Sequence, residues 1–491
     1  MSFRKLKSPA IRPRGRRPVR RPAGRYGTGY TGWAPHQVIS PHEEATERSL
    51  IQRRAEELVE SDPFAAGAIE STAANVIGRG LRAQSSLPYR LLGIPEDEAM
   101  QIQADMEAAF ELWQTESHSR GLATFGDLQF MNISTMLSLG DSVFLPRMSK
   151  APGRTFGFCL LDLHPQRVAT PANMQTRTDI IDGVEIDDDG RPVAYWVGNP
   201  PKGTPAATLS SPDFERVPAR RGHWPGFIHC YRYTQPEMYR GRSVFSSGAK
   251  LHRQLDTALD YSLIGQIIAA SFPVFISSQS GPPTLPALGG QQDFEAEEYP
   301  LVQEYAPGQV IYGRPGDDAR TLSSNIPGPN FVEFSKVVLR AMSASLNIPY
   351  EVLSKDFSES NYSSARAAML EAWRMFQIYR AHAGAHFAQI CWNCVIEEAF
   401  LRGMWSTGSG PDFYEARQLW TRARWIGPAR GYVDPVKEVV SYIKGLDAGI
   451  FTLADVAAEQ GQDWEDTVDQ RKREKQRLHE AGLKEEDDNA A

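Results

Sequence analysis

One run of helix-favouring residues is far longer than the helices of ordinary globular domains. Residues 364–402 place apolar side chains such as Trp373 at helical spacing, whereas globular helices commonly run over about 8 to 20 residues. Two further predicted helices, 243–271 and 330–346, enclose a segment punctuated by Pro and Gly. A single compact enzyme domain would not usually place such long helices around a small insert.

The N-terminal part is also predicted to be largely helical. Asp62 is a capping residue followed by proline at the first helical position, and Gly78 ends the apolar run that follows. A further helix near residues 98–116 carries an apolar face with the 3.6-residue period. That face consists of Ile102, Met106, Ala109, Phe110 and Trp113.

Between residues 141 and 242 the pattern changes to short β-favouring runs, including 143–146 and 155–163. Two other runs, 184–186 and 193–197, flank an Asp-Gly sequence that ends at Gly190 and is typical of a hairpin turn. Together with the long helices, these runs predict an α+β fold that is mainly helical. The C-terminal 75 residues are expected to form short helices.

The composition suits a folded chain in a reducing compartment. A length of 491 residues corresponds to about three domain-sized units, and four cysteines do not indicate a disulfide framework. The longest apolar stretch, 263–276, is interrupted by Gln266 and Pro273. It falls short of the roughly 18 residues that a membrane helix needs, so no membrane partner is predicted.

The net charge of −7 conceals an uneven distribution. The first 25 residues contain ten Lys or Arg and no acid, which leaves −17 on the other 466. Residues 1–39 are predicted to form a flexible basic arm. The arm could bind nucleic acid through phosphate contacts, or it could be a solvated tail or bind a partner protein. The candidate contacts are Arg12, Arg14, Arg16, Arg17, Arg20 and Arg21.

Two motifs associated with enzymes lack the context that their chemistry needs. Residues 27–32 match GxGxxG, but an Arg/Pro run rather than a strand precedes them. Cys391 and Cys394 form a CxxC inside the long helix, where His382 would lie roughly 13 Å from Cys391, too far for a shared metal. No Gly-Lys pair occurs, so there is no P-loop. We therefore predict no catalytic, cofactor or metal site.

Five long stretches resemble the portal proteins of tailed bacteriophages, specifically the lambda-type family. They are DPFAAGAIESTAANVIGRGL (62–81), APGRTFGFCLLDLHPQRV (151–168), DGVEIDDDGRPVAYWV (182–197), SNYSSARAAMLEAWRMF (360–376) and WIGPARGYVDPVKE (425–438). The resemblance extends from about residue 42 to 483, and the basic arm lies outside it. Such stretches are far more specific than the short motifs above.

The resemblance implies a structural protein, not an enzyme, that forms a ring, usually of twelve subunits, at one capsid vertex. Double-stranded DNA would enter and leave through this ring. The implied partners are the large terminase subunit, a head-completion or connector protein, and the major capsid and scaffold proteins. The implied locations are the virion and, during assembly, the host cytoplasm.

The family plan of wing, stem, clip, channel loop and crown maps onto the sequence. The expected ranges are the basic arm (1–39), wing (40–242), first stem helix (243–271), clip (272–328), second stem helix (329–353), channel or tunnel loop (354–364), long wing or crown helix (365–409), crown (410–483) and a frayed acidic tail (484–491).

Candidate DNA contacts lie on both stem helices. Lys336 and Arg340 are i, i+4 neighbours on the second stem helix, and Lys250 and Arg253 lie on the first. We expect one of these pairs to face the bore and to centre the duplex weakly. The alternative is ordinary intersubunit or solvent-facing charge.

The channel loop is the other candidate contact, through Lys355, Ser358, Ser360 and Asn361. Acidic residues in the same loop favour a steric or valve-like role over tight binding. The alternative function for the whole chain is a nucleic-acid-processing enzyme with a basic arm. That reading would need a convergent acidic metal site, and the sequence contains no spacing that builds one.

Overall fold

The structure is a computed structural model that describes residues 41–199, 213–270, 274–276, 310–312, 330–358, 362–430 and 435–480. The basic arm with its six candidate arginines, the GxGxxG motif, Ser360, Asn361, most of the predicted clip and the acidic tail lie outside the described residues. None of the described helices is long and apolar enough to cross a membrane.

Helices dominate the described chain. They are α1 (Pro41–Ser61), α2 (Pro63–Val76), α3 (Tyr89–Leu92), α4 (Glu96–Gln114), α5 (Phe125–Leu139), α6 (Ala249–Ala270), α7 (Phe331–Leu346), α8 (Tyr350–Ser354), α9 (Tyr362–Ala383), α10 (Gln389–Leu401), α11 (Arg417–Trp420), α12 (Pro435–Asp447), α13 (Leu453–Glu459) and α14 (Trp464–Glu480).

The strands are short and belong to several small sheets. They are β1 (Arg82–Ser85), β2 (Asp141–Met148), β3 (Phe158–Leu163), β4 (Ile180–Ile181), β5 (Val184–Ile186), β6 (Pro192–Asn199), β7 (Asp213–Pro218), β8 (Arg220–Arg221), β9 (Trp224–Pro225), β10 (Ile228–Tyr231), β11 (Val274–Ile276), β12 (Val310–Tyr312) and β13 (Ala423–Ile426). The chain is thus mainly helical with sheets, as the sequence predicts.

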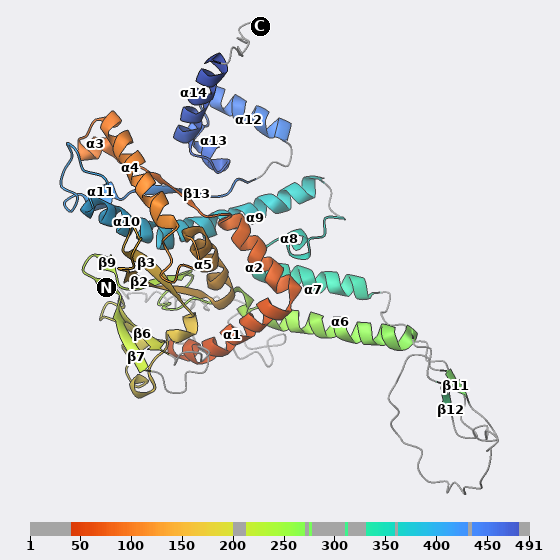
Figure 1. Cartoon of the computed structure of the whole chain (residues 1–491). Coiled ribbons are helices and arrows are strands. Elements are labelled where there is room, and N and C mark those ends of the chain that lie inside the picture. Colours follow the sequence, from red (N-terminus) through yellow and green to blue (C-terminus); the bar gives the residue numbers. More distant parts are fainter. Residues whose placement is uncertain are drawn as a thin grey trace, which may run out of the picture.

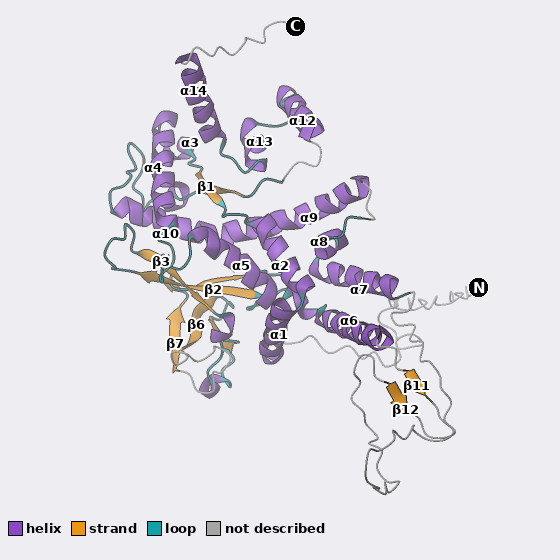
Figure 2. Cartoon of the chain, turned by 45° about the vertical axis from the view of Figure 1, so that its right-hand side comes forward, coloured by secondary structure: helices purple, strands orange, loops and turns teal. Residues whose placement is uncertain are grey.

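Apart from the β11–β12 pair, the described elements form three parts (Figures 1 and 2). Most helices and sheets pack into what we call the body, and α6 and α7 run side by side and project from it. Helices α12, α13 and α14 form a C-terminal layer at one end of the body. The sequence-predicted succession of helix, insert, helix and long helix is therefore present as α6, β11–β12, α7 and α9–α10.

The first core of the body surrounds α4. The five side chains predicted to share one face of this helix are all buried. They pack with Trp392 of α10 and Phe158 of β3 in one aromatic-rich cluster, and the Trp113 indole donates to the carbonyl oxygen of Phe158 over 2.8 Å. Burial of each large apolar side chain contributes about 1.5–3 kcal/mol, so this core accounts for the position of α4.

The second core joins α1, α2, α5 and α9 to the near ends of α6 and α7. Helix α2 starts where Asp62-Pro63 predicts, and the Asp62 carboxylate accepts the N–H groups of Phe64 and Ala65. Its other oxygen lies 2.6 Å from Nδ1 of His252 on α6. The same side chain therefore caps one helix and fixes the base of another.

Two sheets cover one side of the body. A three-stranded sheet has the order β10-β2-β3, and a four-stranded sheet has the order β4-β5-β6-β7. The predicted hairpin joins β5 to β6 in antiparallel pairing. Gly190 at its tip has φ 78°, a conformation that glycine adopts without steric cost.

The predicted helix 243–271 begins later than expected. Ser243 caps a single 3₁₀ turn, Val244–Ser246, and α6 starts at Ala249. Similarly, the predicted second stem helix, 329–353, is two helices. Asn347, at φ 60°, ends α7 in the left-handed region, and α8 follows.

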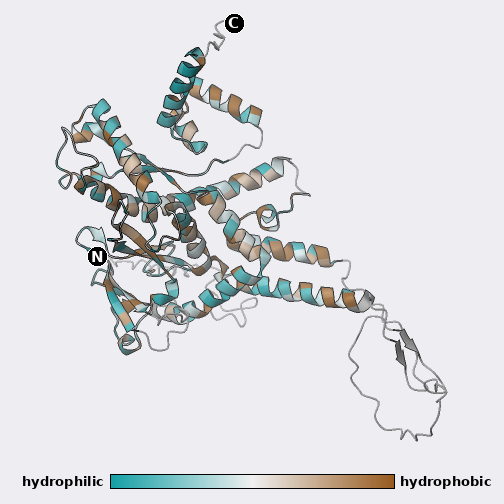
Figure 3. Ribbon diagram, in the orientation of Figure 1, coloured by the Kyte–Doolittle hydropathy of each residue, from teal (hydrophilic) through white to brown (hydrophobic). Residues whose placement is uncertain are grey.

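The strict four-residue apolar stripe of α6 does not stay on one face. Leu255 is 3% exposed, but Leu259, Leu263 and Ile267 are 43%, 57% and 53% exposed. An α-helix has 3.6 residues per turn, so each step of four residues rotates the stripe by about 40°. The stripe therefore leaves the body-facing side as α6 projects, and Figure 3 shows hydrophobic residues on the projecting parts of α6 and α7.

The long helix extends from α9 through a π-helical segment, Gly384–Ala388, into α10. A Cβ atom at Gly384 would lie 3.2 Å from the Trp425 side chain. Glycine thus allows β13 to cross close to the helix at the π segment. The prediction of one exceptionally long helix is confirmed, with this local irregularity.

The expected crown boundary at residue 410 falls inside the body. Phe413 and Trp420 are fully buried in the first core, and β13 pairs antiparallel with β1, with Arg82 opposite Ile426. The pairing joins residues more than 300 positions apart, which local pattern cannot reveal. The C-terminal layer therefore starts only beyond residue 430.

Candidate functional site

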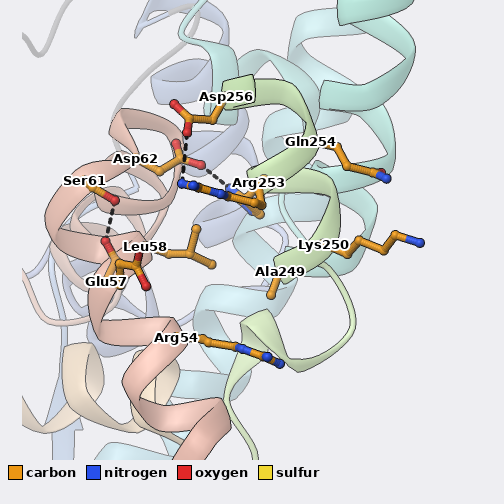
Figure 4. A pocket seen from close by; sticks show the side chains of 11 residues that line it. Arg54, Glu57, Leu58, Ser61, Asp62, Ala249, Lys250, Arg253, Gln254 and Asp256 are labelled. Atoms are coloured by element: carbon orange, nitrogen blue, oxygen red, sulfur yellow. Dashed lines mark hydrogen bonds and ion pairs between the residues drawn. The ribbon is translucent and has the colours of Figure 1, made fainter. Parts of the chain in front are cut away.

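Lys250 and Arg253 lie near the base of α6, beside a cavity of about 700 Å³ between α6 and α1. Figure 4 shows Arg253 reaching toward α1, with its Nη1 atom 3.4 Å from Asp256 of its own helix, whereas Lys250 extends away from α1. The two cations were predicted as a pair, but they point in different directions.

Lys336 and Arg340 lie on α7 in different surroundings. Lys336 is 17% exposed and its Nζ lies 3.6 Å from Glu333. Arg340 is exposed, and its guanidinium lies 5.6 Å from the centre of the Tyr350 ring, within cation–π range. Glu333 and Tyr350 therefore keep the charged groups of Lys336 and Arg340 close to α7 and α8.

The described part of the predicted channel loop is a tight polar turn after α8. Lys355 has φ 54°, and the Asp356 carboxylate accepts the Ser358 N–H at 3.0 Å and its hydroxyl at 2.6 Å. These hydrogen bonds lower the pKa of Asp356, so it stays ionised at neutral pH. The turn presents exposed polar groups of both charge signs.

The thiols of the CxxC motif lie in the core. Cys391 and Cys394 are both fully buried, and burial raises their thiol pKa values. A thiol held protonated in an apolar core is a poor metal ligand or nucleophile. Among the described residues no group of three or more His, Cys, Asp or Glu side chains could hold a metal ion.

A buried ion pair, which the sequence did not reveal, links the three-stranded sheet to the four-stranded sheet. Arg240 and Asp141 are 2% and 0% exposed, and their Nε and Oδ2 atoms lie 2.5 Å apart. Arg240 also donates to three backbone carbonyls. Burial alone would raise the pKa of Asp141, but the charge of Arg240, the neighbouring His229 and the charge of Arg48 together outweigh burial and hold that pKa far below its usual range.

Exposed apolar side chains on the projecting helices are a second feature that the predicted sites did not include. On α7, Phe334 and Val337 are 52% and 61% exposed, and the exposed Ala341 and Ala344 continue the same stripe at a/d-type spacing. On α6, Leu263 and Ile264 are at least half exposed. Contiguous apolar faces of this kind mark surfaces that other protein covers.

A comparison with protein families identifies the chain. The sequence model described as phage portal protein, lambda family, matches residues 27–380, which is well over half of the chain. The chain belongs to the lambda family of phage portal proteins. Portal proteins of this family are structural, so the predictions of a phage portal protein and of a non-enzymatic function are confirmed.

Named portal proteins match almost the whole length. The portal protein of Escherichia phage N15 is 26% identical over 500 residues, covering 96% of this chain and 94% of its own. Portal protein B of Escherichia phage lambda is 26% identical over 511 residues, covering 98% of this chain and 95% of its own. A probable portal protein of Halomonas phage phiHAP-1 is 21% identical over 464 residues and covers 93% and 85%.

Solved structures of gene transfer agent particles are also similar to the portal chain. A chain of the native virion aligns at TM-score 0.41 and 14% identity, covering 87% of this chain and 96% of that one. A chain of the empty particle's neck, computed with C6 symmetry, aligns at TM-score 0.42 and 14% identity, covering 83% and 93%. The assignment to the portal family rests on the sequence matches.

Proposed function

We propose that the chain assembles into a ring at one vertex of a phage capsid and that double-stranded DNA is packaged and ejected through the ring. Membership of the portal family supports the role. The observation that best supports ring formation is the pair of projecting helices α6 and α7, whose outer faces expose large apolar side chains. Neighbouring copies would cover these faces all round a closed ring.

The charge distribution supports a conduit in preference to a tight DNA-binding site. Each phosphate that a Lys or Arg neutralises adds affinity through counterion release, and a ring repeats every such contact. The chain beyond its first 25 residues carries a net charge of −17. A bore wall with this acidic character would bind the duplex weakly and let it slide through the ring.

We propose that weak contacts still centre the duplex, through cations on α6 or α7. Since Arg253 is turned toward α1 and Lys250 is not (Figure 4), Lys250 is the better candidate on α6. The corresponding cations on α7 are Lys336 and Arg340. A ring structure with at least one of these four side chains on the bore wall would support the proposal. All four on the outer surface of the ring would refute it.

The loop between α8 and α9 is proposed to act on DNA as a valve. Deleting residues 358–360 should leave ring formation intact but reduce DNA packaging or retention, because a shorter loop no longer obstructs the bore. Packaged DNA per particle measures this in a phage complementation assay. The matched control, Ser358→Thr with Ser360→Thr, keeps both the loop length and the hydroxyl groups and should package normally. Normal packaging by the deletion variant would contradict the valve role.

The remaining partners follow from the same role. We propose that residues 272–328, the insert between the projecting helices, bind the large terminase subunit first and a head-completion or connector protein later. Contacts with the major capsid and scaffold proteins would fix the ring in the shell. The protein would then be found in the virion and, during assembly, in the host cytoplasm.

A further inference from the structure

The C-terminal layer is attached to the body by few buried contacts. In the described range 435–480 only Gly445, Ala457 and Asp463 are buried, and α14 contains no buried residue. Two cavities, of about 730 and 240 Å³, lie between this layer and the body. Segments with little burial open at lower free energy than a core does, so this boundary is where the chain can move.

Carboxylates from both sides meet at this boundary. Glu107 of α4 accepts the Ser85 N–H of β1 over 2.6 Å. Across the boundary, Glu465 lines the smaller cavity together with Ser85, and Asp466 pairs with Arg82 of the same strand. The start of α14, with Asp463, Glu465 and Asp466, therefore faces the part of β1 that Glu107 contacts, and these three charges act on that of Glu107. Asp463 is 5% exposed and accepts the Glu465 N–H at 2.9 Å, so its carboxylate serves as the helix cap.

The two cations described beside the acidic cluster, Arg82 and Arg424, are too exposed to neutralise it. Arg82 of β1 forms an ion pair with Asp466, but the two side chains are 56% and 60% exposed, so solvent screens the pair. Arg424 of β13 lines the smaller cavity with Glu465 and is exposed. Asp469, one turn further along α14, adds another negative charge near Glu465.

We propose that Glu107 is a proton-controlled latch between the body and the C-terminal layer. Neutral Glu107 lets the start of α14 lie against α4 and β1, whereas ionised Glu107 repels the three facing carboxylates and loosens the layer. The hydrogen bond from Ser85 survives protonation, because the neutral acid keeps a carbonyl oxygen that accepts it. The proposal concerns the chain itself and does not depend on ring formation.

The titration range follows from the surroundings of Glu107. Burial raises its pKa and the Ser85 hydrogen bond lowers it. The charges of Asp463, Glu465 and Asp466 raise it further, and the result is a pKa of about 7. When the layer opens, the pKa of Glu107 returns toward the ordinary value of a glutamate, 4.5. Because the closed state binds the proton more tightly, rising pH favours opening between these two values and has no further effect above about 7.

Hydrogen exchange of α14 in the full-length chain tests the latch. After correction for intrinsic exchange, the opening equilibrium should rise by up to about tenfold per pH unit from pH 5 to 7 and level off above about 7. The Glu107→Gln variant should stay at its closed level throughout. The matched control, Glu111→Gln, one turn further along α4 and exposed, should keep the wild-type profile.

Two outcomes would overturn the latch. One is a wild-type profile that is flat from pH 5 to 8.5, and the other is the same pH profile in wild type and Glu107→Gln. If Glu107→Gln fails to fold, Glu465→Gln gives a second test. Removing one facing charge lowers the pKa of Glu107 in the closed state, so the opening equilibrium should level off at a lower pH than in wild type. Levelling off at the same pH as in wild type would equally contradict the proposal.

Discussion

A chain that carries Leu263→Asp and Ile264→Asp is expected to fold as a subunit but not to form rings. Both side chains are at least half exposed on the projecting part of α6, so the free subunit loses little by the change. In a ring each would be buried against a neighbour, at about 1.5–3 kcal/mol per side chain. Losing ~3 kcal/mol per interface lowers the association constant more than 100-fold.

Native mass spectrometry measures the assembly state, and circular dichroism verifies that the subunit is folded. The matched control is Gln254→Asp, which adds a negative charge to an exposed polar position of the same helix, near its base. This variant should assemble as the wild type does. Rings of normal stability from the double variant would show that the outer face of α6 is not an interface.

Replacing Arg240 by methionine is expected to destabilise the subunit strongly, by about 3–5 kcal/mol. Methionine keeps much of the side-chain length but leaves Asp141, which is 0% exposed, without its cation. The hydrogen bonds to three backbone carbonyls are lost as well. The carboxylate must then be buried unpaired or take up a proton.

Urea unfolding at pH 7 measures this loss. The matched control, Arg191→Met, removes an 80% exposed arginine that pairs with Asp187 at the hairpin tip, and should change stability by at most about 1 kcal/mol. The pH dependence has a definite sign. Because the pKa of Asp141 is depressed in the folded state, its stabilising contribution is present above about pH 4 and declines under acid. Equal losses in both variants would contradict the role of the buried pair.

Local signals explain what could be predicted from the sequence. The Asp62-Pro63 cap, the apolar face of α4 and the Asp-Gly hairpin each depend on a few adjacent residues. Helix α5, by contrast, was not predicted from the sequence pattern. Two polar side chains, Gln129 and Asn132, are buried among its apolar positions and interrupt the periodicity. Gln129 is there to accept the Leu81 N–H over 2.7 Å.

Contacts between distant parts of the chain account for what could not be predicted. Arg240 and Asp141 are both charged residues that would normally be assigned to the surface, and only the fold brings them together. Glu107 acquires its acidic neighbours from residues 463–466. The sequence could in principle have predicted that the apolar stripe of α6 rotates away from the body. Side chains spaced four residues apart change direction gradually on a helix with 3.6 residues per turn.

Electron microscopy of the purified full-length chain tests the central claim most directly. If the chain forms a portal, particles should be closed rings with a central hole, and a refined map should place α6 and α7 of adjacent subunits in contact through their exposed apolar faces. A chain that stays monomeric or dimeric at concentrations where related portal proteins assemble, with those faces open to solvent, would contradict it.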